Sequence, residues 1–132
     1  MNGVPKGKAY NLKRYKQVLD YSGLMFERGI TPTDIDGLLD FSGRLFVILE
    51  FKHASAPLPF GQRLAFERIC DGLQKAHTLS ACLVARHHHP PEEEITAADA
   101  IVTEYRYMGK WRTPQRPISV RDAIDRLKAL PF

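Results

Sequence analysis

Residues 45–52, LFVILEFK, constrain the fold of this chain most, because this short stretch is apolar almost throughout. Side chains of a β-strand alternate between the two faces of a sheet. The odd-numbered residues 45–51 therefore form one wholly apolar face, which belongs in a core. The even-numbered residues begin apolar and end in Glu50 and Lys52. The pattern predicts a strand whose second face becomes polar only at its C-terminal end.

The neighbouring sequence predicts an α/β fold around this strand. Residues 35–41 are predicted to form a second strand, and Ser42-Gly43 predicts a hairpin turn in which Gly43 takes a positive φ. The two prolines within 54–59 end the second strand. Spacing and caps predict helices over 11–28, over 60–76 and after Ser119, and strands over 78–86 and 100–107. The order α-β-β-α-β-β-α predicts a mixed central sheet, a hairpin plus a crossover strand, flanked by helices.

Size and composition are typical of one globular domain. The 132 residues have 44% hydrophobic and 26% charged content, so we expect a single domain over 1–132. No apolar run reaches the roughly 18–20 residues that span a bilayer, and the N-terminus lacks a signal-peptide core. We therefore expect a cytoplasmic protein with no membrane partner. Cys70 and Cys82 fall in apolar patterns and are expected to be reduced and buried, and the alternative is a disulfide.

Positive charge is concentrated in two windows. The net charge is +4, and residues 1–19 and 105–121 each carry five Lys or Arg and no acid. Acids gather between these windows. This distribution suits a polyanion held around a cation-binding centre, and the alternative is ordinary solvated surface.

Three charged side chains are expected to meet at one end of the predicted hairpin. A turn centred near residue 43 pairs position 36 with about position 50, so Asp36 lies beside Glu50. Lys52 is two residues further on and shares the face of Glu50. Carboxylate oxygens are ligands that Mg²⁺ prefers, and a lysine there can position an attacking water or neutralise a phosphate. The alternative is a cross-strand acid–lysine pair on a half-exposed face.

This placement resembles the PD-(D/E)xK nuclease superfamily, whose members include Holliday-junction resolvases and RecB-type nuclease domains. The matching residues are DIDG, residues 34–37, and EFK, residues 50–52, on either side of the hairpin. The resemblance covers residues 20–86 and implies a restriction-endonuclease-like core. It further implies a metal-dependent nuclease in which Asp36, Glu50 and the carbonyl of Phe51 hold Mg²⁺ or Mn²⁺.

The identity of the first aspartate has two alternatives. The family's Pro-Asp pair is not continuous here, because Pro32 is followed by Thr33 and then Asp34. The register favours Asp36 as the ligand, because it lies opposite Glu50. Asp34 is then a second acid near the metal or a loop residue.

Two further site residues follow from the resemblance. QRLAF, residues 62–66, resembles the Gln-x-x-x-Tyr motif of RecB-type members, and Gln62 heads the predicted inward stripe of Phe66, Ile69 and Leu73. An inward Gln62 can hydrogen-bond a water or a phosphate, and the alternative is a surface glutamine. Glu27 matches a position at which many members place another metal-binding glutamate, and the alternative is a surface acid.

DNA is the expected partner, with cations outside the centre as candidate phosphate contacts. Trp111 lies among several of them and either stacks on a base or is buried. The run HHH, residues 87–89, has no companion at zinc-ligand spacing and is expected to be a polar loop. The candidate nucleic-acid contacts are Lys13, Arg14, Lys16, Arg63, Lys110 and Arg112.

The sequence thus predicts a metal-dependent DNA nuclease that hydrolyses phosphodiester bonds, with Asp36, Glu50, Lys52 and Gln62 as catalytic candidates. Two alternatives belong to other classes. One is a nucleic-acid-binding module that keeps the fold without turnover, and the other is a protein-interaction scaffold encoded by a phage or mobile element. The resemblance also allows for a homodimer.

Overall fold

A computed structural model describes residues 18–131 of the chain. The chain divides into two compact units, Met1–Pro32 and Thr33–Phe132. The single domain expected over 1–132 stays a prediction. Among the described residues, no helix combines the length and apolarity that a membrane crossing requires.

The prediction of a helix over 11–28 is wrong for residues 18–28. These residues form two short 3₁₀ turns, η1 (Ser22–Leu24) and η2 (Glu27–Gly29). Arg28 and Gly29 have φ angles of 62° and 74°, a left-handed conformation that does not continue a helix. Helices in proteins depend on packing of an apolar face, and the apolar side chains that gave the helical spacing are exposed. These side chains are Val18, Leu19, Met25 and Phe26.

The second unit is built on a five-stranded mixed sheet in the order β1-β2-β3-β4-β5. The strands are β1 (Gly37–Asp40), β2 (Leu45–His53), β3 (Leu79–His87), β4 (Ile101–Tyr107) and β5 (Lys110–Arg112). Only β2 and β3 are parallel, and the helix between them is α1 (Phe60–Lys75). Helix α2 (Val120–Lys128) follows the sheet, and a 3₁₀ turn, η3 (Ala97–Asp99), precedes β4. The predicted α/β class, with a hairpin and a helical crossover, is confirmed.

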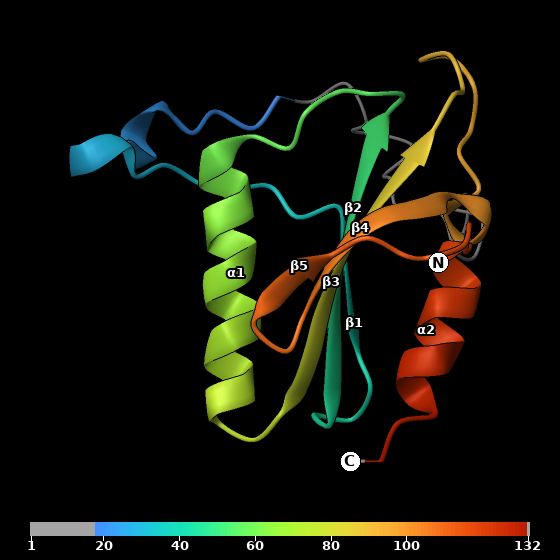
Figure 1. The fold of residues 1–132 in the computed structure, drawn as a ribbon. Helices are drawn as coiled ribbons and strands as arrows, with labels where there is room; N and C mark the ends of the chain where they lie inside the picture. The colour runs from blue at the N-terminus through green and yellow to red at the C-terminus, as the bar shows by residue number, and fades with distance from the viewer. Residues whose placement is uncertain (1–17, 132) are drawn as a thin grey trace, which may run out of the picture. The chain divides into compact units, whose positions relative to one another are not determined.

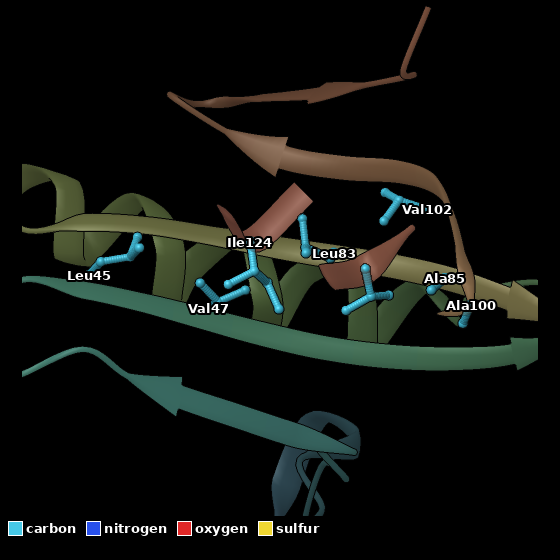
Figure 2. Close-up of a cluster of buried hydrophobic side chains, with 8 residues drawn as sticks. Leu45, Val47, Leu83, Ala85, Ala100, Val102 and Ile124 are labelled. Carbon is cyan, nitrogen blue, oxygen red and sulfur yellow. The ribbon is translucent and has the colours of Figure 1, made fainter. Parts of the chain in front are cut away.

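The two helices cover opposite faces of the sheet (Figure 1). On the α2 face, the odd-numbered side chains Leu45 and Val47 are fully buried, and they cluster with Leu83 and Ile124 (Figure 2). Leu49 and Phe51 pack against this cluster, which confirms the wholly apolar face predicted for residues 45–51. On the α1 face, a second cluster contains Ile48, Leu58, Phe66, Cys70, Cys82 and Val84.

The inward stripe of α1 differs by one residue from the prediction. Phe66 and Cys70 are buried, whereas Ile69 is 40% exposed. The stripe follows i, i+4 and i+8 from Gln62, and this places Ile69 at the solvent edge. Both cysteines are free and buried, as predicted.

The β1–β2 turn has the predicted chemistry. Ser42 and Gly43 both have positive φ angles, 57° and 73°. Asp40, beside the turn, accepts a hydrogen bond from the Gly43 N–H through Oδ1 at 2.7 Å. This turn sets the hairpin register, in which Gly37 pairs with Leu49.

The sequence did not predict β5. It follows a tight turn in which Met108 and Gly109 have φ angles of 50° and 77°. Gly109 was the available signal, because a glycine between two alternating segments is typical of a two-residue hairpin turn. The strand is only three residues long, so its own alternation is too short to identify it.

Candidate functional site

The hairpin register brings two acids together where β1 begins and β2 ends. Because Gly37 pairs with Leu49, the next positions outward are Asp36 and Glu50. Asp36 is exposed, whereas only 3% of Glu50 is accessible to solvent. The structure therefore places Asp36 beside Glu50, as the sequence predicted.

Asp36 is held against the end of β2 by a backbone hydrogen bond. The Phe51 N–H donates to its Oδ2 at 2.8 Å. In an antiparallel pair, the N–H and C=O of one residue point to the same side. The carbonyl of Phe51 therefore faces the edge of β2 at which Asp36 lies.

Glu50 is a buried acid with three polar neighbours. Burial is the largest effect on its pKa, followed by a hydrogen bond and repulsion from Asp36, and together these raise the pKa to about 7. Lys52 Nζ lies 3.7 Å from Glu50 Oε1 and lowers the pKa, as does a hydrogen bond from Gln62. The unfavourable effects of burial and of Asp36 outweigh the two favourable contacts.

Gln62 connects the first turn of α1 to Glu50 and to the main chain of Asp34. Its Nε2 donates to Glu50 Oε2 at 2.9 Å and to the backbone carbonyl of Asp34 at 3.1 Å. Its Oε1 is buried and has no hydrogen-bond partner among residues 18–131. Gln62 thus points inward, as one of its two interpretations predicted. Asp34 contacts Gln62 only through its main-chain carbonyl, and the side chain of Asp34 is exposed.

The residues present fit a hard divalent cation. Two carboxylates lie close enough to oppose each other's ionisation, and a cation between them would remove that cost. Carboxylate and carbonyl oxygens are the ligands that Mg²⁺ prefers, and it keeps several waters when few protein ligands are available. Among residues 18–131, no group of three or more His, Cys, Asp or Glu side chains is arranged to hold a metal. Asp36, Glu50 and the Phe51 carbonyl are the candidate ligands.

Arg86 is a residue near the site that the sequence analysis missed. It pairs with Lys52 across the parallel strands β2 and β3. Its Nη1 donates to the carbonyls of Ala54, at 3.1 Å, and of Ala56. Arg86 thus holds the loop between Lys52 and α1 against the end of β3 through these two hydrogen bonds. The available signal was a single arginine ending the apolar run of residues 79–85.

Comparison with protein-family models, curated proteins and solved structures found no match to this chain.

The predicted nucleic-acid contact Arg63 is engaged within the protein. Its Nη2 lies 3.0 Å from both carboxylate oxygens of Glu104, and its guanidinium lies 4.5 Å from the centre of the Trp111 ring. Trp111 packs against the α1-face cluster and donates through Nε1 to Glu67 at 2.6 Å. The sequence left two alternatives for Trp111, stacking on a base or burial, and the structure shows its ring packed against the cluster. A DNA-binding role for Arg63 stays a prediction.

The other predicted site residues have no contact with Glu50 among the interactions of residues 33–131, belong to the first unit, or lie outside the described residues. Lys110 and Arg112 are exposed on β5, and Arg112 donates through Nε to the Tyr107 carbonyl at 3.1 Å. Glu27 is exposed in η2 of the other unit, and its metal-binding role stays a prediction. Lys13, Arg14 and Lys16 lie outside the described residues.

The histidine run lies at the end of β3 and beyond it. The ring centre of His87 is 5.3 Å from that of His53 and 5.9 Å from that of His89. Slight burial and the neighbouring histidines lower the pKa of His87. His89 also contacts Glu93 at 2.9 Å.

Proposed function

We propose that this protein is a divalent-metal-dependent nuclease that hydrolyses phosphodiester bonds of DNA. The observation that carries the proposal is the contact between Asp36 and Glu50, with the Glu50 pKa raised to about 7. Burying an acid beside a second acid is unfavourable and needs compensation. A bound divalent cation supplies this compensation.

The arrangement of elements supports the same proposal. A β-hairpin, a crossover helix and a parallel third strand place both acids and Lys52 at one end of β2. This order resembles the core of the PD-(D/E)xK nucleases, and we propose a restriction-endonuclease-like fold on that basis. The motif residues 34–37 and 50–52 occupy the corresponding end of the hairpin.

Each side chain of the site has a defined role in the proposed reaction. Asp36, Glu50 and the Phe51 carbonyl would hold Mg²⁺ or Mn²⁺, which when bound polarises a phosphoryl oxygen and lowers the pKa of water. The Lys52 ammonium would orient the attacking water and offset negative charge that develops on the phosphate. Gln62 is a positioning residue, because its amide holds the Glu50 carboxylate.

Cleavage of defined substrates tests the proposal. Linear duplex, circular, single-stranded and branched DNA are incubated with the wild type and with Glu50→Ala and Lys52→Ala, in Mg²⁺, in Mn²⁺ and in EDTA. We expect cleavage by the wild type only with metal, and losses of about 100-fold or more in both variants. Glu92→Ala and Lys75→Ala are matched controls, because both residues are exposed and lie outside the site.

Metal binding provides a second measurement on the same proteins. A ligand that binds only the folded state raises the melting temperature. We expect Mg²⁺ or Mn²⁺ to raise the melting temperature of the wild type but not the melting temperature of Asp36→Asn. The melting temperature of Asp34→Asn should rise as in the wild type. Equal cleavage by Glu50→Ala and the wild type would refute the site. DNA binding without cleavage in either metal would favour the binding module over the nuclease.

A further inference from the structure

A cavity lies on the face of the sheet opposite Glu50. Its volume is about 730 Å³, and its floor includes Leu83 and Val102, which belong to the α2-face cluster. Glu50 lies on the other face, because it alternates in step with Ile48 of the α1-face cluster. The cavity is therefore separate from the site described above. Its volume falls within the range of about 300–1,000 Å³ typical of small-molecule sites.

The walls of the cavity come from three parts of the second unit. One wall is the β4–β5 hairpin and another is α2. The third is the segment 113–118, which returns to the start of β4. There Val102 donates to the Ile118 carbonyl, and Val120 donates to the Ala100 carbonyl, both at 2.9 Å. The segment is thus anchored to the sheet immediately before α2 begins.

The polar lining of the cavity is positively charged. Arg112, Arg116 and Arg126 line it, and none of its lining residues is Asp or Glu. All three arginines are exposed, and none forms an ion pair with another residue of the described part of the chain. Other arginines are paired, for example Arg106 with Asp71 at 2.6 Å. Arg112 donates through Nε to the Tyr107 carbonyl, but no acid of the described residues neutralises any of the three guanidinium groups, so their charge is available to an anion from outside.

Two half-buried tyrosines add aromatic surface beside these arginines. Tyr105 and Tyr107 line the cavity on the face of β4 opposite Arg106. Guanidinium groups bind phosphate oxygens with matching geometry, and aromatic rings stack on nucleic-acid bases. The floor itself is apolar. A ligand with one flat ring and one phosphate matches this lining, because the ring suits the apolar floor and the tyrosines and the phosphate suits the arginines.

We propose that this cavity binds a nucleoside phosphate, either as a free nucleotide or as one unit of a single strand. The base packs against Tyr107 over the apolar floor, and the phosphate contacts Arg116 and Arg126. The proposal does not depend on nuclease activity, because the cavity and Glu50 lie on opposite faces of the sheet.

Calorimetric titration of the full chain in EDTA tests this site without cleavage. The probes are deoxyadenosine 5′-monophosphate (dAMP), deoxyadenosine, inorganic phosphate and a deoxyadenosine pentanucleotide. We expect dAMP or the pentanucleotide to bind at least about tenfold more tightly than deoxyadenosine or phosphate. Competition by dAMP against the pentanucleotide identifies a free nucleotide as a ligand. Binding of the pentanucleotide alone identifies a strand.

The double variant Arg116→Gln/Arg126→Gln should weaken binding by about tenfold or more. Tyr107→Leu should bring the affinity for dAMP close to that for inorganic phosphate. Arg121→Gln is the matched control and should bind as wild type, because Arg121 lies on α2 outside the cavity and pairs with Asp125. Two results would overturn the proposal: no binding of dAMP or the pentanucleotide, or wild-type affinity in the double variant with its circular dichroism unchanged.

Discussion

Glu50 is the residue at which burial and charge conflict most in this protein. Only 3% of it is exposed, and Asp36 adds a second negative charge beside it. Lys52 and Gln62 offset part of this cost but leave the pKa at about 7, well above the ordinary 4.5. A folded state that holds a proton which the unfolded state releases has a pH-dependent stability.

The pH dependence can be measured on Glu50→Gln in EDTA. Between pH 4.5 and about 7, folded Glu50 binds more protons than unfolded Glu50, so its contribution to stability is lost as the pH rises through this range. Glutamine keeps the shape and does not titrate. The free energy of unfolding of Glu50→Gln minus that of wild type should rise by about 3 kcal/mol between pH 4.5 and 8.

Chemical denaturation at intervals of pH measures this difference. Glu92→Gln serves as the control, because Glu92 is an exposed acid in a loop. A difference that is constant with pH, or that falls as the pH rises, would contradict the assigned pKa direction at Glu50.

At the scale of elements, the β1–β2 hairpin decides which residues meet. Its turn holds Ser42 and Gly43 at positive φ, and the Asp40 carboxyl accepts the Gly43 N–H. A shift of one residue in register would move every side chain of β1 to the other face. The contact between Asp36 and Glu50 therefore depends on a turn at the far end of the hairpin.

Two glycine-to-alanine substitutions should change stability in opposite directions. A Cβ at Gly43 meets no atom within 4 Å, so the cost comes from its φ of 73° alone, about 1 kcal/mol. A Cβ at Gly72 also meets nothing, and this residue lies within α1 at an ordinary φ. Gly72→Ala should stabilise the protein by about 0.5–1 kcal/mol. Urea denaturation of both variants measures the two changes, and equal signs would refute the argument.

The sheet and its two helices form the framework of the second unit, and each face of the sheet carries a buried apolar cluster. Cys70 lies on α1 and Cys82 on β3, in the cluster between this helix and the sheet. Burial raises the pKa of the Cys70 thiol to about 11 and that of Cys82 still further. Thiolate is the reactive form of cysteine, so both side chains should be inert while this unit stays folded.

Thiol labelling should therefore report global unfolding. In the absence of urea, we expect neither cysteine to react with a thiol reagent over minutes, and in urea both should react together as the unit unfolds. Mass spectrometry of the labelled protein distinguishes single from double modification. Fast reaction of one cysteine in the native protein would show that the α1 face opens locally.

The sequence by itself determined the central strand and the position of the candidate site. Alternation along residues 45–51 identified the core face, and the Ser42-Gly43 turn set the register that places Asp36 beside Glu50. Both signals are local, because strand alternation and turn conformation depend on neighbouring residues. The same local spacing failed at residues 18–28, where the apolar side chains are exposed and Arg28 adopts a left-handed conformation.

Only the tertiary structure decided what surrounds these residues. Glu104 pairs with Arg63 at a sequence separation of 41, and Gln62 reaches Glu50 because α1 packs on one face of the sheet. The cavity lined by Arg126 exists because α2 covers the other face. Such contacts depend on how helices pack across a sheet, and burial, pKa and ion pairing follow from that packing. For this reason a single sequence names the charged residues but does not show which of them are paired and which remain available.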